Sequence, residues 1–211
     1  IPTFDEIITL AQEKSKEAGR PIGLYPETKH PGYFAAIGLP HEAPLLEALS
    51  RAGYSGPDAP VFIQSFEVEN LIALSGKTGV RLIQLVDSDG GPADKSDVSY
   101  ADMLTEDGLK DVARYAAGIG PAKDLVIKRT VLGALDASTG LVGRCHANGL
   151  LVHPWTFRAE NFFLPLGMRR GVSPRKHGDL ARELDHFLAE GVDGLFCDFP
   201  GIARAVIDGQ G

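Results

Sequence analysis

The sequence is poor in the residues that cross-link a chain or carry it through a bilayer. Cys145 and Cys197 are the only cysteines in 211 residues, and because they fall in different predicted elements no disulfide is inferred. We interpret them as two buried thiols, which leaves the redox compartment open. No apolar run approaches the ~20 residues that a membrane-spanning helix needs. The sequence starts at Ile1 without a signal peptide, which decides nothing if residues before Ile1 are missing.

Several well-known motifs are also absent. No Gly-x-Gly-x-x-Gly opens a helix after a strand, so the usual mark of a dinucleotide fold is lacking. There is no Gly-x-Ser-x-Gly nucleophile elbow and no histidine or cysteine cluster with zinc spacing. Residues 87–91 begin like a calcium loop but lack the later glycine and glutamate that such a loop needs.

What is present is an ordinary globular mixture with a negative balance. Hydrophobic residues make up 44% of the chain and charged residues 23%, which excludes general disorder. The net charge of −7 argues against nucleic acid as a partner. The length suits one domain, predicted over residues 1–211, with a core that needs no metal or disulfide to hold it.

Short apolar runs alternate with amphipathic stretches along the sequence. Thr3 and Glu6 have capping-box spacing and predict a helix that ends at Ala18-Gly19. Further helices are predicted over 42–52, 68–74, 104–117, 179–190 and 202–207, with helical pattern also over 123–126 and 131–148. Strands are predicted over 22–27, 61–66, 80–86, 118–121, 150–154 and 194–198, and loops over 87–102 and 158–176.

This alternation amounts to about six βα units and predicts an α/β fold with a parallel sheet. Polar residues gather where the predicted strands end: Glu27, Lys29, Gln64, His153 and Asp198. The carboxyl ends of parallel strands are where a (β/α)8 barrel builds its active site, and six units are two short of eight.

Glu27 and Lys29 stand two apart on an extended segment, so their side chains face the same way. They can be a metal ligand beside a phosphate-binding cation, or a simple ion pair at a rim. Gln64 lies among apolar neighbours and must find hydrogen-bond partners. Its amide can position a substrate group or tie two strands together.

The run 153–158 is the densest cluster of candidate residues. Trp155, the only tryptophan, follows a predicted strand and can wall a pocket or pack at a rim. We interpret His153 as a structural histidine rather than a catalytic one. Arg158 and the four basic residues of the loop that follows can attract an anion, although most loop arginines are simply solvated.

Six runs, in order, make the sequence resemble glycerophosphodiester phosphodiesterases, most closely the periplasmic and plant type. The runs are residues 2–6, 22–29, 62–66, 118–121, 153–158 and 192–200. The resemblance implies a TIM (β/α)8 barrel of the phospholipase C-like phosphodiesterase type. It also implies hydrolysis of small glycerophosphodiesters to glycerol 3-phosphate and an alcohol, with a divalent cation, Ca2+ or Mg2+.

The resemblance assigns roles to six residues. It implies that Glu27 is a metal ligand and that Lys29 is a catalytic residue that supports the phosphate. It further implies that the substrate is bound by Gln64, Phe66, Trp155 and Arg158. It favours a periplasmic or secreted protein, with the cytoplasm as the alternative.

The sequence departs from the family pattern at its start. The family's first strand carries a His-Arg-Gly segment with a catalytic histidine, and its second a Glu-x-Asp metal pair followed by another histidine; neither is present here. We therefore expect strands three to eight of an incomplete barrel. Because the chemistry needs proton transfer and several oxygen ligands for a cation, we expect the complete protein to be an enzyme and these 211 residues to be inactive alone.

Three other interpretations stay open. The first is a non-catalytic barrel that binds a phosphate ester through Lys29 and the loop arginines. The second is a related phosphodiesterase, either a phospholipase D of the sphingomyelinase type or a phosphatidylinositol-specific phospholipase C. The third is a structural fragment without activity.

Overall fold

A parallel sheet forms the centre of the molecule. The computed structural model describes residues 1–209, so the last two positions of the predicted 1–211 domain lie outside the described residues. The sheet has the strand order β1-β2-β3-β6, with every neighbouring pair parallel. Its strands are β1 (Phe62–Ser65), β2 (Arg81–Val86), β3 (Gly118–Pro121) and β6 (Leu151–Val152). The predicted α/β architecture with a parallel sheet is confirmed.

Two further segments extend this sheet, one at each end. Residues 22–27 lie beside β1 through parallel bridges from Leu24 to Val61 and from Glu27 to Gln64. At the other end, residues 193–198 run beside 152–157, where Phe157 N–H donates to the Phe196 carbonyl at 2.8 Å. Pro26 and Pro154 lack the N–H that a continuous ladder needs, so these segments pair less regularly than the predicted strands. Six segments thus lie side by side in the order of the sequence.

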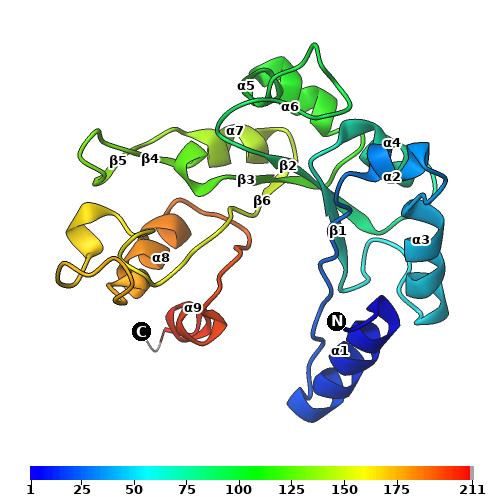
Figure 1. Cartoon of the computed structure of the whole chain (residues 1–211), viewed down its shortest axis with the longest axis horizontal. Coiled ribbons are helices and arrows are strands. Elements are labelled where there is room, and N and C mark those ends of the chain that lie inside the picture. Colours follow the sequence, from blue (N-terminus) through cyan, green and yellow to red (C-terminus); the bar gives the residue numbers. More distant parts are fainter. Residues whose placement is uncertain (210–211) are drawn as a thin grey trace.

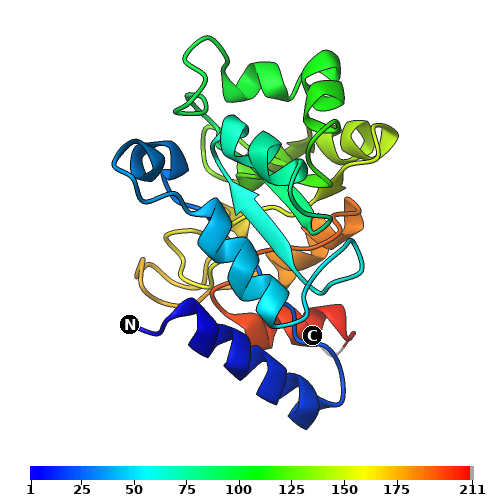
Figure 2. The ribbon, with the colours of Figure 1, turned by 90° about the vertical axis from the view of Figure 1, so that its right-hand side faces the viewer.

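Helices follow the strands and cover one face of the sheet (Figures 1 and 2). They are α1 (Phe4–Ala18), α2 (Pro31–Ala36), α3 (Glu42–Arg51), α4 (Val68–Ser75), α5 (Tyr100–Met103), α6 (Glu106–Val112), α7 (Leu141–Ala147), α8 (Leu180–Ala189) and α9 (Pro200–Ile207). The predicted capping box is present, because the Glu6 amide donates to Thr3 Oγ1 at 3.3 Å while the Glu6 side chain accepts from the Thr3 amide. None of the described helices has the length and apolarity needed to traverse a bilayer.

The core lies between these helices and the outer face of the sheet. Ile63 of β1 packs in one cluster with residues of α3 and α4, among them Leu49 and Leu71. Ile119 of β3 belongs to a second cluster, which extends to Phe187 of α8. Because side chains alternate along a strand, residues 62 and 64 of β1 point to the opposite, inner face of the sheet, as do the alternate residues of the other strands.

The region after β3 differs from its predicted helix. Residues 131–148 were expected to be helical, but α7 begins only at Leu141. Before it, β4 (Ile127–Arg129) and β5 (Leu135–Ser138) form an antiparallel hairpin, preceded by the 3-10 helix η1 (Lys123–Leu125). Gly133 and Gly140 adopt positive φ angles of 78° and 69°, which an α-helix cannot accommodate. These two glycines therefore prevent a continuous helix, although the apolar spacing predicted one.

The structure also differs from the prediction at other places. The helix expected over 104–117 is shorter in the structure, because Thr105 Oγ1 accepts the Gly108 amide at 3.1 Å and caps the start of α6. Helix α5 falls mostly within the predicted loop 87–102. No helix was predicted where α2 lies, directly after His30. The 3-10 helix η2 (Leu166–Met168) interrupts the predicted loop 158–176.

Candidate functional site

The inner face of the sheet holds two cavities, one at each end of the strands. Tyr25, Phe62 and His153 line the lower cavity, at the amino end. Two residues further along the same segments, Glu27, Gln64 and Trp155 line the upper cavity, at the carboxyl end. Because residues two apart on a strand share a face, each segment contributes one side chain to the lower cavity and the next one on that face to the upper cavity. The upper cavity has a volume of about 220 Å³, and its other lining residues are Lys29, Phe66, Leu85, Thr156 and Phe196.

Glu27 and Lys29 share one side of the upper cavity. Their side chains point the same way, as predicted, and Lys29 Nζ lies 2.9 Å from Glu27 Oε1. The Lys29 side chain is 72% exposed and that of Glu27 23%, so the pair is close to solvent and contributes little to stability. An incoming anion can therefore compete for the ammonium group at small cost.

Gln64 brings a buried amide to the same cavity. The strands are joined by its backbone: Gln64 N–H donates to the Pro26 carbonyl at 3.0 Å, and its carbonyl accepts from Thr28 N–H at 3.0 Å. The residue is 6% exposed, and its Oε1 atom has no hydrogen-bond partner within the described chain. A buried acceptor atom without a partner is suited to accept a hydrogen bond from a donor group on a ligand.

Trp155 and Phe66 form the apolar wall. Their rings meet edge to face, with centroids 5.8 Å apart. The Trp155 indole N–H donates to the Gly120 carbonyl at 2.8 Å, which fixes the ring against β3. A Cβ atom at Gly120 would lie 2.6 Å from Leu85 Cδ2, so the glycine lets Leu85 close this wall.

Arg158 lies apart from the upper cavity. Its Nε donates to Asp198 Oδ2 at 2.6 Å, and its guanidinium sits 4.7 Å from the centroid of the Phe163 ring. The structure thus brings together five of the six residues singled out from the sequence. The part of Arg158 in substrate binding stays a prediction.

A third cavity, of about 380 Å³, adjoins the upper cavity and shares Glu27, Lys29 and Phe66 with it. It adds Glu67, which sequence reasoning missed. Glu67 is 6% exposed, and its Oε2 accepts the Gly32 amide at 2.8 Å. The signal that could have identified Glu67 was its position directly after the predicted strand 61–66. Asp87 and Asp89, from the rejected calcium-loop pattern, also line this cavity.

His153 belongs to the lower cavity rather than to the upper one. Its Nδ1 lies 2.8 Å from the Tyr25 hydroxyl, and its ring packs against Gly194. Burial lowers the pKa of His153, with Asp193 opposing and Arg81 adding to that shift. The hydrogen-bonded and buried ring supports the interpretation of a structural histidine.

The described residues do not by themselves fit a divalent cation. Among them, no group of three or more histidine, cysteine, aspartate or glutamate side chains is placed to hold a metal ion. The upper cavity offers the Glu27 carboxylate and the Gln64 amide oxygen, whereas Ca2+ and Mg2+ take six or more oxygen ligands.

Comparison with known proteins identifies the family. The model of the glycerophosphoryl diester phosphodiesterase family matches residues 1–202. The chain belongs to this family. It is 35% identical over 214 aligned positions to the glycerophosphodiester phosphodiesterase GDPD6 of Arabidopsis thaliana, covering 95% of this chain and 54% of that protein. It is 24% identical to the glycerophosphodiester phosphodiesterase of Haemophilus influenzae, covering 95% of this chain and 56% of that protein.

Solved structures show the same fold for this phosphodiesterase family member. A Silicibacter pomeroyi protein assigned to the glycerophosphoryl diester phosphodiesterases superposes with a TM-score of 0.63 at 19% identity. The superposition covers 98% of this chain and 56% of that protein. The chain therefore spans about half the length of the relatives it matches.

Proposed function

We propose that the whole protein hydrolyses glycerophosphodiesters, with water, to glycerol 3-phosphate and an alcohol, and that the upper cavity binds the glycerophosphate part. One observation carries the proposal: Glu27, Lys29, Gln64, Phe66 and Trp155 converge on one cavity at the carboxyl edge of a parallel sheet. Membership of the family supports it. On this proposal the six parallel segments correspond to strands three to eight of an eight-stranded barrel.

Lys29 supplies the positive charge that a phosphodiester needs. The transition state of hydrolysis carries more negative charge on the phosphoryl oxygens than the substrate does, and an ammonium group at the cavity stabilises that charge. In the absence of ligand this ammonium is paired with Glu27 at 2.9 Å. Binding of the phosphate then exchanges one partner of Lys29 for another.

Gln64 and the aromatic wall select the rest of the ligand. The Gln64 Oε1 atom, unpartnered within the described residues, accepts a hydrogen bond from a glycerol hydroxyl. Phe66 and Trp155 contact the carbon backbone and keep water from that side. A buried acceptor that gains a donor discriminates strongly against a ligand that lacks the hydroxyl group.

The family is typically metal-dependent, and the proposal gives Glu27 one place in that requirement. Its carboxylate would provide one oxygen ligand to Ca2+ or Mg2+, and the remaining ligands must come from outside the upper cavity. The histidines that proton transfer requires are likewise not among the residues that line this cavity.

Binding of glycerol 3-phosphate to the chain, measured by calorimetry, tests the proposal. Lys29→Ala removes a charge-assisted contact, so we expect the affinity to fall by about tenfold or more. Lys29→Arg retains the charge and should recover part of the affinity. Lys77→Ala, at an exposed lysine beyond α4, is the matched control and should bind like the unaltered chain.

Equal affinity of the unaltered and Lys29→Ala chains would place the phosphate elsewhere and overturn the proposal for this cavity. Assays with glycerophosphocholine and Ca2+ or Mg2+ then separate the enzyme from a non-catalytic binder. Binding without turnover in a protein of the relatives' full length would favour the binder.

A further inference from the structure

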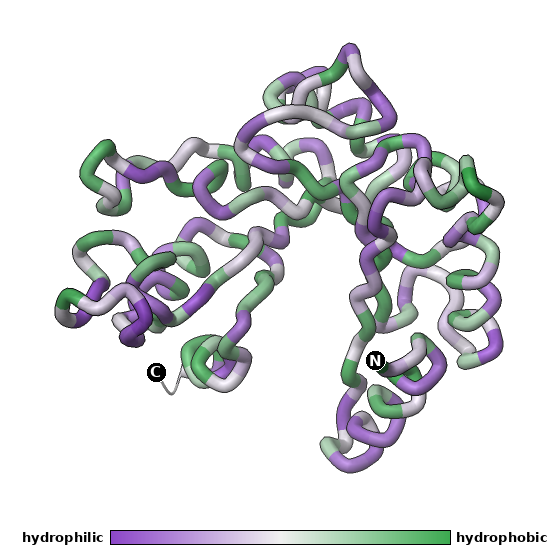
Figure 3. The backbone as a smooth tube through the Cα atoms, in the orientation of Figure 1, coloured by the Kyte–Doolittle hydropathy of each residue, from purple (hydrophilic) through white to green (hydrophobic). Residues whose placement is uncertain are grey.

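Two segments at the carboxyl end of the sheet expose large apolar side chains. They are the β4–β5 hairpin, residues 127–138, and the loop 158–178, and together we call them the apolar rim. The exposed side chains, with their fractional exposures, are Val131 106%, Leu132 79%, Phe162 68%, Leu166 51% and Val172 102%. In Figure 3 hydrophobic stretches mark the outermost turns of both segments.

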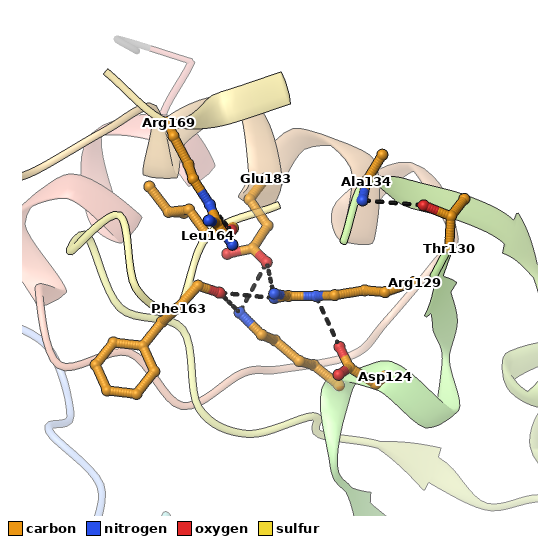
Figure 4. A network of polar contacts seen from close by, with 9 residues as sticks. Asp124, Arg129, Thr130, Ala134, Phe163, Leu164, Arg169 and Glu183 are labelled. Carbon is orange, nitrogen blue, oxygen red and sulfur yellow. Dashed lines mark hydrogen bonds and ion pairs between the residues drawn. The ribbon is translucent and has the colours of Figure 1, made fainter. Parts of the chain in front are cut away.

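The two segments of the apolar rim are held side by side. The Leu166 amide donates to the Gly133 carbonyl at 2.8 Å, which joins η2 to the turn of the hairpin. Arg129 Nη2 donates to the Phe163 carbonyl at 2.7 Å (Figure 4). Buried Asn161 braces the outer turn of the loop, with Nδ2 donating to the Ser173 carbonyl at 2.9 Å. The apolar tips are therefore presented by a fixed framework.

The apolar rim is also basic, in a chain that is acidic as a whole. Residues 127–138 and 158–178 contain seven lysines and arginines and two acidic residues, against twenty-one and twenty-eight in the complete sequence. Arg158 and Arg170 are paired with Asp198 and Asp179. The exposed lysines and arginines that face solvent without such pairing in the described structure are Lys128, Arg169, Arg175 and Lys176.

Both segments stand at the same end of the sheet as the upper cavity. The hairpin follows β3, and the loop follows the segment that continues β6. Since both strands are parallel to β1, their carboxyl ends meet at the edge where Lys29 and Trp155 lie. The apolar rim and the candidate site therefore lie at the same end of the sheet.

We propose that the apolar rim docks on the surface of a bilayer that contains anionic phospholipids. Apolar side chains at protruding turns can enter the interfacial layer while neighbouring lysines and arginines contact the phosphate groups. The local positive charge of the apolar rim, in a chain that is acidic as a whole, complements such a surface. This interaction does not depend on hydrolysis and goes beyond the proposed function.

Flotation with lipid vesicles tests the proposal. The chain should bind vesicles of phosphatidylcholine mixed with phosphatidylglycerol, bind phosphatidylcholine alone weakly, and dissociate at high salt. Each basic residue near an anionic surface contributes about a fivefold factor, so Arg175→Ser with Lys176→Ser should weaken binding by about 30-fold. Val131→Ser with Leu132→Ser should weaken it without altering the salt dependence.

Ile37→Ser with Leu39→Ser is the matched control, because these side chains are 53% and 60% exposed but lie outside the apolar rim. That variant should bind like the unaltered chain. The proposal is overturned if no vesicle binds, or if the rim and control variants lose affinity equally. It is also overturned if the chain self-associates in sedimentation and Leu132→Ser abolishes this, because a second copy would then cover the apolar rim.

Discussion

His153 shows how a single residue takes its role from its position on a strand. It shares the alternating inner face with Trp155, yet it lies two residues nearer the amino end and joins Tyr25 in the lower cavity. Because the His153 ring is buried against Tyr25 and Phe62, its neutral form is favoured over the charged form. Asp193 favours the charged form, but its effect on the pKa of His153 is smaller than that of burial.

The lowered pKa of His153 predicts a pH dependence of stability. When pH falls below about 6.5, the unfolded chain binds the proton before the folded chain does, so stability is lost as pH falls through the folded pKa. The free energy of unfolding should fall by at most about 1.4 kcal/mol per pH unit from this group. Urea unfolding between neutral and mildly acidic pH measures the slope. His153→Gln should reduce it, whereas His30→Gln, at an exposed position, should not.

At the residue scale the sequence predicted which side chains gather at the carboxyl end of the sheet, but not the residues that surround them. The placement of Glu27 and Lys29 followed from the strand period, and Gln64 and Trp155 followed from the shared carboxyl edge of the sheet. Arg158 lies in a loop, where no periodicity fixes the direction of a side chain. Glu67 is held by the amide of Gly32, thirty-five residues earlier, a contact that no local pattern reveals.

The hairpin β4–β5 is an element whose position depends on buried charges. Glu183 of α8 is fully buried, and its Oε1 accepts from Lys123 Nζ at 2.7 Å and from Arg129 Nη2 at 3.3 Å. Both cations also donate to the Phe163 carbonyl. Figure 4 shows Arg129 between Glu183 and Phe163. One carboxylate and one carbonyl thereby join η1, the hairpin, the loop and α8.

Breaking this buried network should be costly. Glu183→Gln leaves two cations together without their carboxylate, and we expect the free energy of unfolding to fall by about 3–5 kcal/mol. Lys123→Met removes one cation and leaves Glu183 with Arg129, so its effect should be smaller. Lys110→Met, in the exposed pair with Glu106, is the control and should change stability by less than about 1 kcal/mol. Equal losses for Glu183→Gln and Lys110→Met in chemical unfolding would contradict this account.

At the element scale, a helix was predicted correctly where its capping residues and its apolar spacing indicated the same bounds. Helix α1 has both, from Thr3 to Gly19, and its bounds were correct. From residue 131 onward the apolar spacing suggested a helix, but Gly133 turns the chain and the buried pairing of Arg129 holds the hairpin in place. That pairing joins residues fifty-four positions apart, so it could not be deduced from the segment itself.

On the scale of the whole molecule, the order of the six segments was predictable because βα alternation allows few arrangements. The cavities were not, because they depend on which side chains the inner face lacks. Gly118 and Gly120 of β3 let Leu151 and Leu85 pack closely, because a Cβ atom at either glycine would lie less than 3 Å from one of these leucines. Only the assembled sheet shows which neighbouring side chains fill that space.

The buried carboxylate of Glu183 also bears on how fast the molecule folds and unfolds. Its partners lie sixty and fifty-four positions away along the chain, so these contacts close long loops and should form after the folding barrier has been crossed. We therefore expect Glu183→Gln to raise the unfolding rate constant and to leave the folding rate constant nearly unchanged in stopped-flow experiments. A slower folding rate would instead place the network in the folding nucleus. On this account, the charges that fix the hairpin chiefly prolong the lifetime of the folded state.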